Sequence, residues 1–537
     1  MNRSKLIPST LTPTPSPAGQ WKLLSLLFLC LVFLFHSYPL GLSDFWWHMN
    51  NGRWIWDTLS LPSTDPFTYS YARDDDIRRV VILKAYYLGQ VSFYFVHSLL
   101  GIWGLLFYKT LLLLVPYILL LKYLRYRDVD PVFAILLLCP LPFIIFRLDE
   151  LRPHIFSFIG AVWVFYLLER FIDALKAGQR PHQYAVLIPI VMLAWANLHR
   201  GFIIGWVILF TYLFFAIIHS IRGKNSLTPQ QLKLLIIVCS TGILITLLNP
   251  NGANAFLANF VELKGPFMQV IDEFFPLWKY SKLYQAWHIF FGCVAITLLT
   301  AYFFWQAFIR GTSRPQAVHL VLAAGFAYEG FATFRFSHFL CFLLLAIGAK
   351  YYAQTSHELV QKHRKVFVSL LLVSLFVLGS FAILRSAVWK GPLETAYIPQ
   401  KAVEFIQKNR PAENLFNAFE YGGYASWALS PQYKIFIDQR NLDYSVYKEY
   451  GRAWNGDYAD VFNKYQVNTV LFYLQQPVLG RVPRLVKRLL IDNNWQVVYV
   501  DRLSIVLIKA QSNTDLPIYD KNKVANYLIQ LDSASNK

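Results

Sequence analysis

Residues 21–48 read WKLLSLLFLCLVFLFHSYPLGLSDFWWH. The part at 21–41 is apolar and long enough to cross a bilayer, and no small-residue cleavage site follows it, so it predicts a retained signal anchor. Asp44 and His48 stand where this helix would leave the membrane, and ionisable groups are costly there unless they serve a function. Trp46 and Trp47 are typical of the interfacial aromatic belt. Residues 44–48 are therefore either an interfacial anchor with a helix cap or a functional site.

The composition is that of a membrane protein. The chain has 537 residues, of which 56% are hydrophobic and 15% are charged. Its repeated apolar runs of about 20 residues predict a polytopic α-helical membrane protein. The net charge of +19 is first explained by basic cytoplasmic loops, so we do not expect nucleic acid as a partner. All the cysteines lie in apolar runs, which excludes a disulfide framework or zinc site in the soluble segments: Cys30, Cys139, Cys239, Cys293 and Cys341.

Hydropathy divides the chain into four regions. We expect a disordered cytoplasmic tail at 1–20, a transmembrane domain at 21–389 with its first outer loop at 42–102, an extracytoplasmic α/β domain at 390–510, and a polar tail at 511–537. Within the α/β domain, short β-rich runs alternate with amphipathic helices. The predicted strands are 415–419, 434–438, 469–472, 496–500 and 504–508, and the predicted helices are 401–409, 447–454 and 482–493.

The stretch 83–100 decides the topology. It is apolar but short, and Lys84, Gln90 and His97 interrupt it. If it lies along the interface, the later basic loops face the cytoplasm, as the positive-inside rule requires, whereas they face outward if it crosses. We therefore predict an interfacial segment, a cytoplasmic N-terminus and about eleven spans. These spans are near 21–41, 103–122, 131–147, 153–172, 184–199, 201–221, 231–249, 286–308, 316–334, 336–353 and 365–386.

On this topology the connectors of the outer face collect charged residues. The turn at 147–154 has almost no slack and carries Asp149, Glu150, Arg152 and His154. These groups are either a self-satisfied ion cluster or a site in which the carboxylates join Asp44 and the arginine holds a phosphate, because guanidinium presents a planar fork of donors.

Two further turns carry candidate ligands on the same face. Asn197, His199 and Arg200 form either a polar turn or a set of hydrogen-bond donors to a head group. Arg335 either snorkels to the interface or binds a phosphate. Asp272 and Glu273, in the long loop 250–285, are either solvated or rim a cavity, and we favour solvation.

Carboxylates and cations on one membrane face suit an anionic, lipid-linked substrate. A carboxylate is a natural base for a hydroxyl acceptor, and cations offset the charge of a phosphate leaving group. The sequence has no Ser–His–Asp order, Walker loop, CxxC or HExxH motif. Paired carboxylates permit a divalent metal, but no spacing demands one, so we assign no metal ligands and no certain cofactor.

An ordered set of motifs along the chain resembles the motifs of a bacterial family of GT-C-type membrane glycosyltransferase-like proteins. The first outer loop matches at Asp44-Phe45-Trp46-Trp47-His48, Gly52, Ile55, Pro62 and Asp65-Pro66-Phe67-Thr68. The match continues through Arg152-Pro153-His154-Ile155-Phe156-Ser157, Leu167-Leu168-Glu169-Arg170, Trp195-Ala196-Asn197-Leu198-His199, Leu248-Asn249-Pro250-Asn251-Gly252, 417–424 and Phe436-Ile437-Asp438-Gln439-Arg440. More distantly, the chain is similar to protein O-mannosyltransferases, the lipid A aminoarabinose transferase and the oligosaccharyltransferase catalytic subunit.

The resemblance implies a GT-C fold with interfacial helices in the first outer loop and a polyprenyl-phosphate-sugar donor. Carried over to this sequence, the role of base or acceptor-orienting group falls on Asp44, and the acidic position of the second loop falls on Asp149 or Glu150. Many relatives would have glycine where Arg200 stands. Asp128-Val129-Asp130 looks like the DxD motif of soluble glycosyltransferases, but it falls on the cytoplasmic side and is predicted to be a solvated turn.

The resulting hypothesis is an inverting glycosyltransferase of the bacterial inner membrane that acts on its non-cytoplasmic face. Its acceptor would be an envelope glycan, lipid or protein. Asp44, with Asp149 and Glu150, would carry the catalysis, and substrate would be bound by His48, Arg152, His154, Asn197, His199, Arg200 and Arg335. The alternatives are a non-catalytic scaffold of the same fold and, less favoured, a transporter, which should carry charged residues near mid-span.

Overall fold

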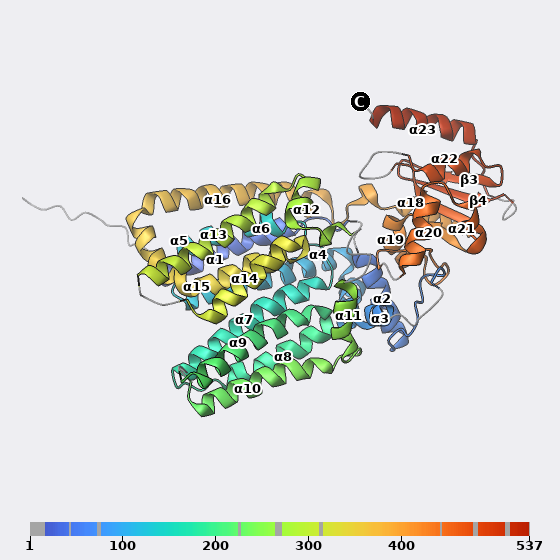
Figure 1. The fold of residues 1–537 in the computed structure, drawn as a ribbon. Coiled ribbons are helices and arrows are strands. Elements are labelled where there is room, and N and C mark those ends of the chain that lie inside the picture. The colour runs from blue at the N-terminus through green and yellow to red at the C-terminus, as the bar shows by residue number, and fades with distance from the viewer. Residues whose placement is uncertain are drawn as a thin grey trace, which may run out of the picture.

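The computed structural model describes residues 17–41, 44–71, 77–223, 227–263, 271–310, 315–440, 443–475, 482–510 and 516–535. Residues 1–16 of the predicted tail at 1–20 lie outside the described residues. Figure 1 shows a long bundle of helices and, at one of its ends, a separate domain that contains the sheet.

The helical bundle confirms the predicted membrane fold class. Eight helical segments of the described chain are long and apolar enough to cross a membrane. They contain α1 (Pro17–His36), α4 (Tyr87–Tyr126), α7 (His154–Lys176), α9 (Ile203–Ile221), α10 (Pro229–Leu244), α13 (Trp287–Ile309), α15 (Ser337–Lys362) and α16 (Arg364–Arg385). The other three predicted spans are shorter apolar segments, formed by α5 (Pro131–Leu138) with α6 (Leu141–Ile145), by α8 (His182–Leu198) and by α14 (Ala317–Ala332). The count of eleven is therefore not confirmed.

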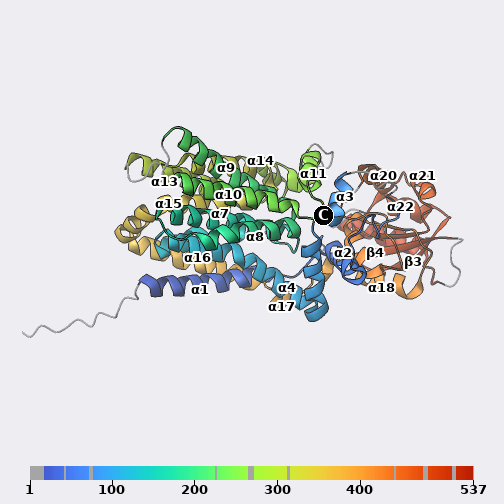
Figure 2. The same ribbon diagram turned by 90° about the horizontal axis from the view of Figure 1, so that it is seen from below.

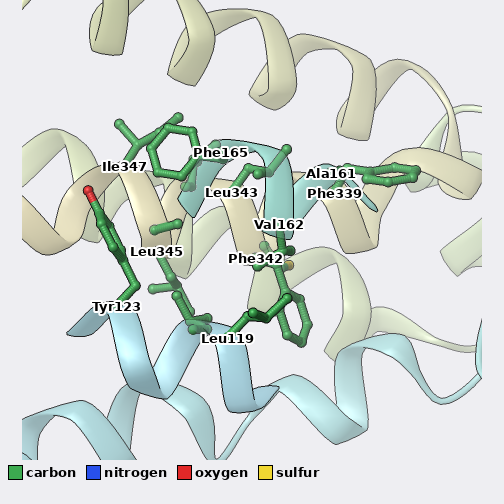
Figure 3. Packing of buried hydrophobic residues seen from close by; sticks show 14 of the residues in the cluster. Leu119, Tyr123, Ala161, Val162, Phe165, Phe339, Phe342, Leu343, Leu345 and Ile347 are labelled. Carbon is green, nitrogen blue, oxygen red and sulfur yellow. The ribbon is translucent and has the colours of Figure 1, made fainter. Parts of the chain in front are cut away.

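Helix α15 lies at the centre of the bundle. Its residues 339–347 are all buried, which is expected of a helix that is apolar all round. Figure 3 shows Phe339, Phe342 and Leu343 of this helix packed among side chains of α4 and α7, including Leu119 and Phe165. Burial of these side chains fixes α4, α7 and α15 relative to one another, and their outer ends carry the connectors that matter for function.

The first outer loop contains three helices that meet at the end of the bundle: α2 (Phe45–Thr58), α3 (Ile77–Lys84) and the first half of α4. Gly101, with φ of 61°, breaks α4 into two helices. The first helix has about 14 residues and so a length of about 21 Å, which is shorter than the apolar core of a bilayer. In Figure 2 this first half turns across the end of the bundle, as an interfacial segment would.

The C-terminal domain has a second hydrophobic core around a four-stranded sheet of order β1-β2-β4-β3. β1 (Leu415–Asn417) pairs parallel with β2 (Thr469–Tyr473), while β4 (Ser504–Lys509) pairs antiparallel with β2 and with β3 (Trp495–Val500). The predicted strand at 434–438 makes only isolated bridges, from Ile435 to Thr68 and to Leu415. The helices are α18 (Gln400–Asn409), α19 (Gly422–Leu429), α20 (Tyr444–Trp454), α21 (Ala459–Lys464), α22 (Arg484–Ile491) and α23 (Lys521–Ser535).

The first outer loop joins the two bodies. In α2, the side chain of Asn50 donates to the Ser426 backbone oxygen of α19 at 3.1 Å. Further along, two backbone hydrogen bonds cross the junction: Tyr69 N donates to Ile435 O, and Ile435 N donates to Phe67 O. The second connection is the chain itself, through α17 (Ala387–Lys390) and a bridge between Leu40 and Leu393.

The remaining elements are short and lie in connectors. They are the helices α11 (Asn254–Leu263) and α12 (Leu277–Leu283) and the 3₁₀ turns η1 (Arg200–Phe202), η2 (Ile245–Leu247), η4 (Asp272–Phe274), η5 (Phe334–Phe336), η6 (Thr395–Tyr397) and η7 (Phe419–Tyr421). Turns η1, η4 and η5 carry the remaining candidate site residues.

Candidate functional site

Arg152 is the centre of a charged cluster at the end of the bundle nearest the C-terminal domain. Its Nη1 lies 3.3 Å from Asp44 Oδ2 and 2.7 Å from Glu273 Oε1, and its Nη2 lies 2.6 Å from Glu150 Oε2. Arg335 approaches the other oxygen of Glu273 at 3.7 Å. We call these five residues the Arg152 cluster.

Three distant segments supply the carboxylates of the cluster. Asp44 occupies the N-cap position of α2, Glu150 precedes α7 by one tight turn, and Glu273 lies in η4. Arg152 is held within that turn because its backbone N–H donates to the Glu150 oxygen at 2.9 Å and its own oxygen accepts from Ile155 N at 3.1 Å. The packing of the helices thus brings the charged connectors at their ends into contact with one another.

Burial and charge act against each other in the cluster. Burial raises the pKa of Asp44 and of Glu150, although Arg152 partly opposes this effect. Burial would also raise the pKa of Glu273, but Arg152 and Arg335 outweigh it and lower that pKa to about 2. The three carboxylates raise the pKa of Arg152 despite its burial, so the guanidinium stays charged. Glu273 is therefore a fixed anion, whereas Asp44 has raised basicity.

Glu273 is the residue that sequence reasoning missed. We predicted that it would be solvated, yet it contacts Arg152 and Arg335. The approach depends on tertiary structure, because Phe334 N donates to Phe275 O at 2.9 Å and so ties η5 to the segment that follows η4. An acidic pair in the long outer loop 250–285 was the only signal that pointed to it.

Asp149 does not join Asp44, although it is next to Glu150 in sequence. Its fully buried carboxylate accepts from His36 Nδ1 at 2.8 Å, Tyr38 OH at 2.9 Å and Arg385 Nη1 at 3.1 Å. Burial opposes ionisation, but Arg385 and the His36 hydrogen bond prevail and lower the pKa of Asp149 to about 2. Asp149 therefore ties the turn at 147–154 to α1 and α16.

Two of the predicted ligands are engaged in hydrogen bonds within the protein. His48 is buried, and its Nδ1 lies 3.0 Å from Gln90 Nε2 of α4. Burial, then the charge of Arg152, lowers the pKa of His48 well below its ordinary value, so its ring is neutral. His154 donates from Nε2 to the Leu148 oxygen at 2.8 Å. Both residues shape the surroundings of Asp44 and Arg152.

The turn between α8 and α9 is also built by its own polar residues. Asn197 donates to the Leu193 and Leu248 oxygens and accepts from Tyr87 OH at 2.9 Å. His199 Nδ1 lies 2.5 Å from Ser157 Oγ and accepts from Gly201 N. Burial, then the charge of Arg335, lowers the pKa of His199. Arg200 is the first residue of η1, and its charge acts on His199 in the same direction.

Asp128-Val129-Asp130 forms a helix cap at the other end of α4. Asp130 accepts from the backbone N–H groups of Val132 and Phe133 and so caps α5. The ring of His357 lies 3.5 Å from Asp130 and 3.8 Å from Asp128. The predicted turn fits this geometry.

A cavity of about 300 Å³ borders the Arg152 cluster at Glu150. It lies between the end of α1, the turn before α7 and the segment that leaves α16. Its polar lining consists of Tyr38, Glu150, Arg385, Lys390 and Glu394. A polar group that enters this cavity would therefore meet one carboxylate of the cluster and two cations.

The cluster does not fit a metal ion as it is arranged. Within the described part of the chain, no three His, Cys, Asp or Glu side chains lie close enough together to hold one. Asp44, Glu150 and Glu273 surround the guanidinium of Arg152 instead.

Comparisons with known proteins find similarity in structure alone. No family model and no curated protein matches the sequence. The fold is similar to that of the oligosaccharyltransferase AglB from Archaeoglobus fulgidus in complex with an inhibitory peptide and a dolichol-phosphate, with a TM-score of 0.57 and 13% identity over 93% of this chain and 75% of that one.

Two further structures of the Archaeoglobus fulgidus oligosaccharyltransferase give similar values. The apo form has a TM-score of 0.55 and 13% identity over 93% of this chain and 75% of that chain. The complex with Zn and sulfate has a TM-score of 0.51 and 14% identity over 92% and 74%. The chain described here is therefore a multi-pass membrane protein with a GT-C-like fold, as its motifs predicted.

Proposed function

We propose that this protein is a membrane glycosyltransferase that moves a sugar from a polyprenyl-phosphate donor to an envelope glycan, lipid or protein. The observation that carries the proposal is the meeting of Asp44, Glu150 and Glu273 at Arg152, beside Arg335, in a GT-C-like fold. The complex of AglB with dolichol-phosphate and a peptide supports a lipid-linked donor and a separate acceptor.

In this proposal Asp44 is the catalytic base. The side chain of Asp44 is 21% exposed, so an acceptor reaches it, and burial raises its pKa towards the range in which a carboxylate accepts a proton more readily. The acceptor oxygen attacks the anomeric carbon, and its proton passes to Asp44. The bond from that carbon to the donor phosphate oxygen breaks, polyprenyl phosphate leaves with the electron pair, and the configuration inverts.

Arg335 is the proposed phosphate ligand. Its side chain is 32% exposed and contacts Glu273 only at 3.7 Å, so its donors have capacity for an anion. Arg152 suits this role less well because three carboxylates already surround its guanidinium. Arg152 instead positions Asp44. Its positive charge also reduces the net negative charge of the cluster, so that a phosphate can approach.

The C-terminal domain is the proposed acceptor platform. It is attached to α2, the helix that Asp44 caps, through Asn50 and Ser426. The cavity beside the segment that leads to this domain has Glu150 of the cluster in its lining, and it is the proposed place of entry for an acceptor. The positive-inside argument favours the non-cytoplasmic side for this end of the molecule, and the resemblance to a bacterial family favours the inner membrane.

The test is sugar transfer in proteoliposomes with defined polyprenyl-phosphate sugars and extracts of envelope acceptors. Asp44→Asn keeps the shape of the side chain but removes the base, and we expect transfer to fall about 10²- to 10⁴-fold. Asp57→Asn is the matched control, because Asp57 is an exposed carboxylate of the same helix α2. Equal activity of the two variants would remove Asp44 from the mechanism, and no transfer by the wild type with any donor would favour a non-catalytic scaffold.

A further inference from the structure

We propose that the guanidinium of Arg152 occupies the position that a divalent cation would otherwise take among Asp44, Glu150 and Glu273, so that the cluster works without a bound metal. The inference rests on the proposed function for the role of the cluster, but the arrangement of charges that it describes stands by itself.

The carboxylates surround the guanidinium of Arg152 closely. Each comes from a different connector, and each directs an oxygen to one of the two terminal nitrogens of Arg152, at 2.6 to 3.3 Å. Carboxylate oxygens are the donors that Mg²⁺ and Mn²⁺ prefer, but these oxygens are spaced around the two nitrogens of a guanidinium and not around a single ion. A cation that belongs to the chain fills the space between them.

Arg152 is not readily displaced. A guanidinium does not lose its proton to make room for a metal, and the surrounding carboxylates raise the pKa of this one further. Its backbone lies in a turn without slack, held by the Ile155 N–H on one side and by the buried Asp149 contacts with His36 and Arg385 on the other. Moving Arg152 away would leave three carboxylates together without their shared cation.

The charge count supports the same conclusion. Asp44, Glu150 and Glu273 carry three negative charges, and Arg152 with Arg335 supplies two positive ones. Without Arg152 the surplus is two negative charges in a partly buried site, which would attract a dication. With Arg152 in place, a dication would meet both a like charge and oxygens that are already engaged. The positive charge near the leaving phosphate thus comes from arginine side chains.

The decisive measurement is Mn²⁺ binding, followed by electron paramagnetic resonance, to the full-length protein in detergent after washing with a chelator. We expect no saturable site in the wild type or in Arg147→Ala, an exposed arginine of the same turn. Arg152→Ala should gain one site with a dissociation constant at least tenfold lower than any wild-type binding. Adding Asp44→Asn to Arg152→Ala should remove that gain.

Two results would overturn the inference. One is a saturable Mn²⁺ site in the wild type that Asp44→Asn abolishes, and this titration decides the question even if Arg152→Ala does not fold. The other is a folded Arg152→Ala protein that gains no site. Neither result depends on transfer activity, so a failure of the proposed function is recognised separately, by the absence of sugar transfer in proteoliposomes.

Discussion

Replacing Arg440 by leucine should loosen the junction between the first outer loop and the C-terminal domain. Arg440 is 5% exposed, its Nη1 lies 2.6 Å from Asp65 Oδ1, and its Nη2 lies 2.7 Å from Asp438 Oδ2. Asp438 is fully buried. Removing the only cation of such a group leaves buried carboxylates uncompensated, which costs about 3–5 kcal/mol.

The assay is hydrogen exchange of the backbone amides of Tyr69 and Ile435, which donate across this junction. A loss of 3–5 kcal/mol corresponds to a fall in protection of about 100-fold to a few thousand-fold, at about 1.4 kcal/mol for each factor of ten. The matched control is Arg452→Leu. Arg452 contacts Asp457 with both side chains exposed, so its loss should leave the protection of both amides almost unchanged.

The pH dependence gives a second readout of the same variant. Burial raises the pKa of Asp438 even with Arg440 present, and in Arg440→Leu that pKa should rise further. A group whose pKa is higher in the folded state than in the unfolded state stabilises the fold at low pH, and this stabilisation is lost as pH rises through the folded-state pKa. The defect of Arg440→Leu should therefore be smaller at pH 5 than at pH 8, and adding Asp438→Asn should remove this difference. Unchanged protection of both amides at pH 8 would refute the reasoning.

Three further predictions concern packing and charge. Gly52→Ala should destabilise the protein by about 1–3 kcal/mol, because its new Cβ would clash with the Gln90 backbone oxygen, whereas Gly325→Ala, with open space around it, should not lower the thermal midpoint. Glu169→Gln should lower that midpoint far more than Glu358→Gln, since Glu169 is buried against a guanidinium and two tyrosine hydroxyls, while the pair made by Glu358 is exposed. The pKa of Glu273 is lowered to about 2, so its ion pairs stabilise the fold fully above its unfolded value near 4.5 and are lost as pH falls towards 2. As pH falls from about 4.5 towards 2, the stability of Glu273→Gln should accordingly change less than that of the wild type.

The sequence predicts well whatever depends on local pattern. Apolar runs place the helices, and alternation places β1 to β4 close to their observed bounds. The parity of the spans puts Asp44, Glu150, Arg152 and Arg335 on one face, where the structure brings them into a single cluster. Each of these inferences needs only the hydropathy pattern of the chain and the number of membrane crossings.

The sequence does not predict what depends on the direction of a single side chain. Asp149 and Glu150 are adjacent carboxylates, yet one faces α1 and α16 while the other faces Arg152. His48 is one helical turn from Asp44, but it packs against Gln90 of α4. Glu273 reaches the cluster only because η4 and η5 are tied together, a contact between distant segments that no local pattern contains.

The contacts of the first outer loop separate two of its acidic residues, Asp44 and Asp65. Asp44, at the start of α2, faces the Arg152 cluster, and Asp65, beyond the end of α2, pairs with Arg440 of a second motif in the C-terminal domain. Helix α2 lies between them and is itself bound to α19 through Asn50 and Ser426. A shift of the domain would therefore shift α2, and with it the carboxylate that we propose as the base. It follows that Arg440→Leu should also slow sugar transfer, although Arg440 contacts none of the cluster residues, and that adding Asp438→Asn should restore transfer in step with the recovery of amide protection. If transfer stayed at the wild-type rate while protection fell, the domain would be an independent module and α2 would be held by the bundle alone.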